Sequence, residues 1–128
     1  MQEILTQEKS IYLQISEMIE TDILRDILRE EEKVPSTNDL AKMYTINPAT
    51  AAKGINTLVD RGILYKKRGI GMFVAVGAKN QIQKRRREDF YTNYVKKLLQ
   101  EAASIGLDRN EVVQLIMRED EKDGSVNL

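Results

Sequence analysis

Two helices and a β-hairpin are predicted by residues 36–74, which read STNDLAKMYTINPATAAKGINTLVDRGILYKKRGIGMFV. The first helix starts after Ser36, because Ser36 and Asp39 form an S-x-x-D pair in which the serine side chain caps free N–H groups. The second starts at Asn47-Pro48, since asparagine is a favoured N-cap and proline fits the first helical position. Two helices so closely joined form a helix-turn-helix. The expected helices run over 37–44 and from 48 to 60 or 61, joined by a turn at 45–47.

A glycine-rich turn with a strand on each side follows the second helix. Gly62 suits the left-handed position after a helix, so the helix stops there. Two β-prone runs, 63–68 and 72–76, flank the turn 69–71, and this pattern is typical of a β-hairpin. The strand that enters the turn carries a cluster of basic residues. Helix, helix and hairpin in this order indicate a winged helix.

Helical patterns also lie on both sides of this region. Upstream, apolar side chains recur at steps of three and four, so we expect a first helix over about 10–28 that buries one face. Downstream, a helical pattern runs from Asn80 to Gly106, and the capping pair Asp108 and Glu111 starts a last short helix. The apolar positions of the first helix are Ile11, Ile15, Met18, Ile19, Ile23 and Ile27.

The composition argues against an enzyme. The 128 residues contain no histidine and no cysteine, which excludes a disulfide framework, a thiolate zinc site, a cysteine nucleophile and an imidazole acid or base. We expect no catalytic residue, no cofactor and no metal site, although the composition does not exclude a carboxylate site for Mg²⁺ or Ca²⁺. No apolar run approaches the roughly 18 residues of a membrane span, and the acidic start MQEILTQEK does not resemble a signal peptide. The sequence therefore predicts a cytoplasmic protein without a membrane partner.

Charge is unevenly distributed along the chain. Lys and Arg together number 20, as do Asp and Glu, so the formal net charge is zero. Residues 1–35 hold 4 basic and 9 acidic side chains, and residues 101–128 hold 3 and 7. Residues 36–78 hold 6 basic and 2 acidic side chains, and residues 79–100 hold 7 and 2. A middle part with a net charge of +9 thus lies between two acidic ends, and the local field steers a charged partner more than the total does.

Positive charge on a helix-turn-helix and its hairpin favours double-stranded DNA as the partner. In this motif the start of the second helix enters the major groove, where Thr50 can contact a base or a phosphate and Lys53 a phosphate or a guanine. Arg68 lies beside glycines that let the backbone approach a ligand, and arginine fits a narrow minor groove. The candidate DNA contacts are Ser36, Thr37, Asn38, Asn47, Pro48, Ala49, Thr50, Lys53, Lys66, Lys67, Arg68, Gly69 and Gly71.

Each of these features also has an ordinary structural explanation. A capped helix pair can be a plain core element, a basic hairpin tip can be a solvated surface, and winged helices also serve as protein-interaction modules. The order of the elements, with positive charge confined to the later ones, favours DNA. The turn 69–71 is not a nucleotide-binding loop, because it is too short and no helix follows it.

Short motifs follow one another in a fixed order along the chain. In the first part they are Ile11-Tyr12-x-Gln14-Ile15, Val34-Pro35-Ser36, Asp39-Leu40-Ala41, Asn47-Pro48-Ala49-Thr50, Leu58-Val59-Asp60-Arg61-Gly62-Ile63-Leu64 and Arg68-Gly69-x-Gly71-x-Phe73-Val74, and in the last part Arg86-Arg87-x-x-Phe90 and Leu98-x-x-Glu101-Ala102. The first set resembles the DNA-binding domain of the GntR family, over about residues 9–77, and the remaining residues resemble the short two-helix C-terminal domain of the YtrA subfamily. The resemblance implies a bacterial homodimeric transcription factor, usually a repressor, often of ABC-transporter genes.

Four positions depart from the pattern of that family. Asn38 stands where the family usually has an arginine that grips a phosphate, and Ile70 replaces a lysine that is common between the wing glycines. Ala51 and Gly54 replace the usual valine and alanine of the recognition helix. A glycine inside a helix costs about 1 kcal/mol relative to alanine. Two basic contacts are missing, so either the affinity for DNA is modest or other basic residues compensate.

The expected fold is mainly α with a small β-hairpin wing. It comprises a winged helix-turn-helix over 9–77, a two-helix dimerisation domain over 78–118 and a flexible tail over 119–128. The long helix of the second domain has more apolar surface than one short helix covers, so it would pack against a second copy in a two-fold dimer. Such a dimer places two recognition helices about 34 Å apart, which requires an inverted-repeat operator. The candidate dimer residues are Ile82, Phe90, Tyr94, Leu98 and Leu99.

Three alternatives stay open in the second domain. Its apolar side chains could pack within one chain instead of between two. The basic run 84–87 could contact flanking phosphates or pair with acidic residues such as Asp89 and Glu101. A cleft between protomers could bind a small-molecule effector, for which the candidate residues are Arg87, Tyr91 and Tyr94.

Arg68→Ala is expected to weaken operator binding more than Lys42→Ala. Arg68 lies at the tip of the predicted wing, whereas Lys42 lies near the end of the first helix of the motif. Binding titrations with the same operator DNA measure both effects. Equal losses of affinity would overturn the assignment of the wing.

Overall fold

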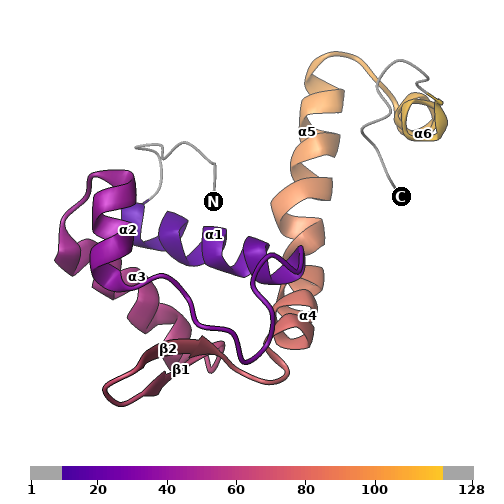
Figure 1. The fold of residues 1–128 in the computed structure, drawn as a ribbon. Helices are drawn as coiled ribbons and strands as arrows, with labels where there is room; N and C mark the ends of the chain where they lie inside the picture. The colour runs from indigo at the N-terminus through magenta and orange to yellow at the C-terminus, as the bar shows by residue number, and fades with distance from the viewer. Residues whose placement is uncertain (1–9, 120–128) are drawn as a thin grey trace. The chain divides into compact units, whose positions relative to one another are not determined.

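The computed structural model describes residues 10–119, and Figure 1 shows how the chain is arranged. The chain divides into two compact units, one that extends through Arg86 and one that starts at Arg87. A π-helical segment, η1, lies between α4 and α5. The elements are α1 (Ile11–Leu24), α2 (Thr37–Tyr44), α3 (Pro48–Asp60), β1 (Leu64–Lys67), β2 (Gly71–Val74), α4 (Ala78–Phe90), η1 (Tyr91–Val95), α5 (Lys96–Ser104) and α6 (Arg109–Met117).

Helices α2 and α3 form the helix-turn-helix expected from the sequence. The side chain of Ser36 accepts the N–H of Asp39 at 3.0 Å, and the Asp39 carboxylate accepts the N–H of Ser36 at 3.3 Å. Asn47 Oδ1 accepts the N–H of Ala49 at 2.8 Å, and a proline occupies the start of α3. Thr45 ends α2 in the left-handed conformation, with a φ of 52°, which turns the chain toward α3. The predicted caps and both predicted helices are confirmed.

Strands β1 and β2 form the expected hairpin, although both are shorter than the predicted runs. They pair antiparallel, with Leu64 opposite Val74 and Lys67 opposite Gly71. The loop between α1 and α2 adds a further bridge, in which Lys33 pairs with Phe73. This loop therefore lies alongside β2 at the outer edge of the hairpin.

An apolar core joins α1, α2, α3, the hairpin and the start of α4. Helices α1 and α3 are in close contact at Gly54, where an added Cβ would lie 2.9 Å from the carbonyl oxygen of Tyr12 and 3.0 Å from Cγ2 of Ile15. The buried Ser16 hydroxyl lies 3.0 Å from the carbonyl oxygens of both Tyr12 and Gly54 and can donate its proton to either. The core residues are Ile15, Ile19, Ile23, Val34, Leu40, Ala41, Ala51, Ile55, Leu58, Ile63, Leu64, Val74, Ala78 and Ile82.

Helix α1 ends at Leu24, so the predicted extension to residue 28 is wrong. Asp26 adopts a left-handed φ of 60°, which breaks the helical path. The N–H groups of Ile27 and Leu28 then both donate to the carbonyl oxygen of Asp22. Ile27 is 59% exposed, although its spacing had placed it on the buried face.

Ile82 belongs to the core of the winged helix, which corrects its assignment to a dimer interface. Its side chain is fully buried, and Ala78 one turn earlier is buried beside it. Helix α4 begins at Ala78, and its first part packs on the winged helix. The boundary between the two units therefore lies after Arg86, not after residue 77 as expected.

The second unit has little interior of its own. Ala102 of α5 and Val112 of α6 are its buried apolar side chains among the residues described. The predicted turn between these helices is confirmed: Gly106 has a φ of 78°, and Asp108 and Glu111 form a capping box. Such a thin interior leaves most apolar side chains of the unit exposed.

Two expectations concern parts of the chain outside the described residues. The acidic start, judged unlike a signal peptide, falls within residues 1–9, and nearly all of the expected flexible tail falls within 120–128. Between residues 10 and 119, none of the helices combines the length and the apolar character needed to cross a membrane.

Gly54→Ala is expected to lower the free energy of unfolding by about 1–2 kcal/mol, although alanine is the better helix former. The added methyl group would overlap the backbone of α1 at Tyr12. Urea unfolding followed by circular dichroism measures the change.

Asn56→Ala is the matched control, because Asn56 is an exposed residue of the same helix. We expect this control to change the stability by less than about 0.5 kcal/mol. A Gly54→Ala variant as stable as the unmodified protein would contradict the close contact of α1 with α3.

Candidate nucleic-acid interface

Helix α3 has an inner side that packs on the core and an outer side that faces solvent. A residue advances about 100° around an α-helix, so positions four and seven apart lie on the same side. The buried side chains and glycine of the inner side are Ala51, Gly54, Ile55 and Leu58. The exposed residues of the outer side are Ala49, Lys53, Asn56 and Asp60.

The backbone at the start of α3 is already hydrogen-bonded. Pro48 has no N–H, the N–H of Ala49 donates to the Asn47 side chain, and the N–H of Thr50 donates to the Asn47 carbonyl at 3.0 Å. These two N–H groups therefore have acceptors within the protein. The half-buried Thr50 makes no side-chain hydrogen bond to any described residue, so its hydroxyl stays available.

Lys53 is held at the edge of the outer side by an aromatic ring. Its ammonium group lies 4.1 Å from the ring centroid of Tyr12 in α1, a cation–π arrangement. Thr57 donates its hydroxyl to the carbonyl oxygen of Lys53 at 2.8 Å, so this hydroxyl is occupied within the helix. Lys53 is thus pre-positioned between α1 and α3.

The start of α2, where Ser36, Thr37 and Asn38 are candidate DNA contacts, carries a carboxylate. The Ser36 hydroxyl is occupied as the cap, and the Asp39 carboxylate lies beside it. Hydrogen bonds from Ser36, first from its side chain and then from its backbone, hold the pKa of Asp39 below its usual value, so the carboxylate is charged at neutral pH. A fixed negative charge opposes a phosphate here. Thr37 is half-buried, and Asn38 is exposed with a free amide among the described residues.

The hairpin presents three consecutive exposed basic residues, Lys66, Lys67 and Arg68. The Lys67 ammonium lies 4.4 Å from the ring centroid of Phe73. Gly69 has a φ of 77° and open space around the position of a Cβ. The tip of the hairpin is therefore open on the side of Arg68 and Gly69.

The side chain of Lys33 packs over Gly71, a contact that was not expected from the sequence. A Cβ at Gly71 would lie 2.7 Å from Cε of Lys33, so the lysine chain passes directly over the glycine. Lys33 belongs to the acidic first part of the sequence, yet its bridge to Phe73 brings it to the basic wing. No local sequence signal reveals it, because the pairing spans a long stretch of chain.

Acidic residues of the α1–α2 loop are bound to the base of the wing. Glu31 accepts the Tyr65 hydroxyl at 2.8 Å, and Glu30 accepts the N–H of Gly77 at 3.0 Å. The hydrogen bond to Glu31 raises the pKa of Tyr65. These contacts fix the carboxylates of Glu30 and Glu31 at the base of the hairpin, opposite its tip.

A buried carboxylate explains part of the basic run 84–87. Glu20 of α1 is 1% exposed, and Nη2 of Arg85 lies 2.6 Å from both of its oxygens. Arg61 and Arg86 approach the same carboxylate at 3.6 Å and 3.7 Å. Arg85 and Arg86 therefore pair with Glu20, which was not among the partners considered from the sequence.

The other two members of that run, Lys84 and Arg87, are exposed. The Glu20 cluster binds the first part of α4 to the winged helix through α1 and the end of α3. This leaves Lys84 and Arg87 as the basic side chains of the run that point to solvent.

The predicted dimer and effector residues that lie in the second unit are exposed, apart from Leu99. Phe90, Tyr94 and Leu98 are each about half exposed or more, and Leu99 is half-buried. The rings of Phe90 and Tyr94 lie 5.5 Å apart between centroids. Tyr91 and Tyr94 both lie in the π-helical segment, a departure from α-helix that is frequent at functional sites.

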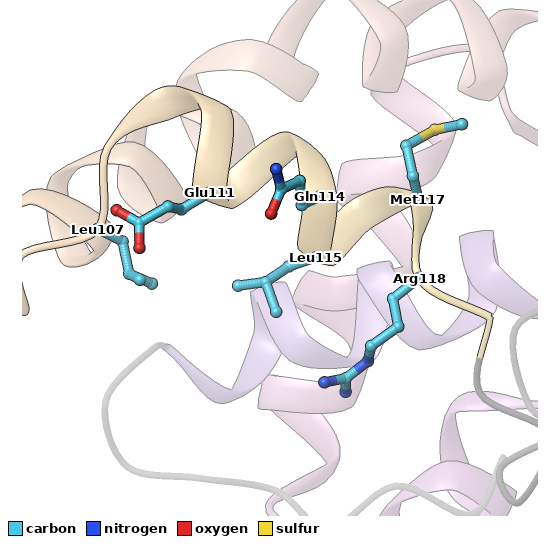
Figure 2. A pocket seen from close by; sticks show the side chains of 6 residues that line it. All are labelled: Leu107, Glu111, Gln114, Leu115, Met117 and Arg118. Atoms are coloured by element: carbon cyan, nitrogen blue, oxygen red, sulfur yellow. The ribbon is translucent and has the colours of Figure 1, made fainter.

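An open groove lies along α6 in the second unit (Figure 2). Its lining combines apolar side chains with one acidic and one basic residue. None of the predicted effector residues lines it. The lining residues are Leu107, Glu111, Gln114, Leu115, Met117 and Arg118. Within residues 10–119, no group of three or more potential metal ligands comes together.

Arg85→Ala is expected to lower the free energy of unfolding of the winged helix by about 2 kcal/mol, because only the two longer contacts then compensate the buried Glu20. Urea unfolding measures the change. Lys84→Ala removes the same charge from an exposed neighbour and is expected to change the stability by less than about 0.5 kcal/mol. Similar stabilities of the two variants would show that Glu20 does not depend on Arg85.

Comparison with known proteins places these features in a family. The model for bacterial regulatory proteins of the gntR family matches residues 11–74. The chain is similar to the transcriptional repressor YtrA of Bacillus subtilis, with 32% identity over 56% of this chain and 55% of YtrA. Other curated regulators are longer, and the chain spans 20%, 26% and 27% of the length of three of them.

Solved structures of GntR-family proteins are also similar to this chain. A GntR-family protein from Bacteroides thetaiotaomicron is 34% identical, with a TM-score of 0.65 over 84% of this chain and 93% of that one. The DNA-binding domain of AraR, solved in complex with an operator, is 32% identical, with a TM-score of 0.50 over 59% of this chain and 92% of that domain. The family model covers half of the chain, and the chain belongs to the GntR family of bacterial regulatory proteins.

Proposed function

We propose that the protein is a transcriptional repressor that binds an inverted-repeat DNA operator as a homodimer. The observation that carries the proposal is the outer side of α3, which is exposed beside a hairpin with three consecutive basic residues. The similarity to the operator-bound AraR domain supports DNA as the partner. In a helix-turn-helix the second helix reads the major groove, and the wing approaches the neighbouring backbone or minor groove.

The distribution of charge supports specific rather than purely electrostatic binding. Lys66, Lys67 and Arg68 are exposed at the wing, where they can neutralise phosphates. Arg85 and Arg86 are used within the protein by Glu20, so less of the basic middle part is available to DNA than the sequence count suggests. Contacts from α3 to the bases must then supply much of the discrimination.

A second copy of this chain is the proposed cover for the apolar side chains of the second unit. The unit buries few apolar residues by itself, whereas Phe90, Tyr94 and Leu98 are exposed near one another in sequence at a spacing of four. Exposed apolar patches of this kind mark interaction surfaces. A two-fold dimer would give the operator its inverted symmetry.

Two finer proposals concern the subfamily and a small-molecule effector. The similarity to YtrA favours membership of the YtrA subfamily and, with it, control of ABC-transporter genes. Arg87, Tyr91 and Tyr94 remain the candidates for a small-molecule effector, and all three are exposed. Both proposals are separate from the binding of DNA.

Selection of binding sites from random DNA is expected to yield an inverted repeat with half-sites about one helical turn apart. Lys66→Ala/Lys67→Ala is expected to reduce the salt dependence of binding to the selected site by about two phosphate contacts for each protomer of the dimer. Lys96→Ala/Lys97→Ala, which removes the same charge from α5, is the matched control and is expected to leave the salt dependence unchanged. Fluorescence anisotropy at several salt concentrations measures both variants.

Two results would contradict the proposal. Enrichment of no DNA sequence would favour the alternative of a protein-interaction module. A monomer at micromolar concentration in sedimentation, with a selected site that lacks symmetry, would remove the homodimer and the inverted repeat together.

A further inference from the structure

Asn56 is an exposed amide on the outer side of α3. It follows Ala49 by seven residues and Lys53 by three, so the three positions share one side of the helix. At a rise of 1.5 Å per residue, Asn56 lies about 10 Å along the axis from Ala49. A helix in the major groove that presents Ala49 to one base pair can therefore present Asn56 to another.

The amide of Asn56 makes no hydrogen bond to any residue between 10 and 119. The neighbouring polar groups of α3 are used differently. Asn47 caps the helix, Thr57 donates to a backbone carbonyl, and the Lys53 ammonium lies over the ring of Tyr12. Asn56 is thus free to donate and accept at the same time.

Asp60 marks the C-terminal end of the part of α3 that can approach DNA. It is exposed one turn after Asn56 on the same side of the helix, and its carboxylate repels phosphates and the acceptor-rich edge of guanine. The part of the outer side that suits DNA therefore runs from Ala49 to Asn56.

The chemistry of an amide selects one base in the major groove. Asparagine can donate to N7 and accept from the N6 amino group of adenine, and this pair of hydrogen bonds distinguishes adenine from the other bases. We propose that Asn56 reads an adenine in each half-site of the operator. This inference rests on the proposed binding of DNA and extends it to a residue that determines specificity.

The test compares the selected sites of the unmodified protein, Asn56→Ala and Asn56→Asp. The unmodified protein is expected to require an adenine at one symmetric position of each half-site. Asn56→Ala is expected to lose that preference, with affinity for the selected site reduced about tenfold per half-site or more, while the other positions are kept. Asn56→Asp is expected to shift the preference to cytosine, because a carboxylate accepts from the N4 amino group.

Asn80→Ala is the matched control. Asn80 is another exposed asparagine without a side-chain hydrogen bond to a described residue, but it lies in α4 and is not a candidate DNA contact, so its loss is expected to leave the selected bases unchanged. Titrations at low salt keep the weaker variants bound through phosphate contacts, so the base preference stays measurable.

The outcomes separate this inference from the proposed function. If the unmodified protein selects an inverted repeat and Asn56→Ala selects the same bases at every position, Asn56 does not read a base. If the unmodified protein selects no DNA, the proposed function itself is wrong. Loss of preference at every position in a folded Asn56→Ala variant would assign Asn56 a structural role and overturn the inference.

Discussion

The contact between α1 and α3 fixes the surface that the protein can present to DNA. At Gly54 the two helices lie so close that a methyl group would overlap the backbone of Tyr12. Ser16 bonds across the same contact, and the side chains around it are buried. Because the inner side of α3 is fixed in this way, its outer side is oriented without any contribution from DNA. A glycine within a helix lowers stability relative to alanine, and a glycine occupies this position because the close packing leaves no room for a methyl group.

Some charged side chains are paired within the protein, and others are exposed and can contact a partner. The buried Glu20 holds Arg85 and Arg86, and Glu31 is bound to Tyr65. Lys33 crosses over Gly71 and joins the basic wing, although it lies in an acidic part of the sequence. A zero net charge is therefore compatible with a basic face, because several acidic side chains, among them Glu20, Glu30 and Glu31, have partners within the protein.

The local features of the fold could be predicted from sequence, and the long-range ones could not. Caps at Ser36 and Asn47 act within three residues, so the helix-turn-helix follows from short patterns. The bridge of Lys33 to Phe73 and the pairing of Glu20 with Arg85 join distant segments, and no periodicity encodes them. The spacing of Asn56 after Lys53 could have identified it, since both lie on the outer side. Ile82 was misassigned because an apolar residue at helical spacing does not reveal which partner covers it.

The most direct measurement is a titration of isotopically labelled protein with its selected operator, followed through the NMR signals of backbone and side-chain amides. We expect the largest changes on the outer side of α3, including the side-chain amide of Asn56, and at Arg68 and Gly69 of the wing. The buried contact at Ser16 and Gly54 should change little. Changes centred on other surfaces, with α3 and the wing unaffected, would contradict the assignment of the DNA-binding surface.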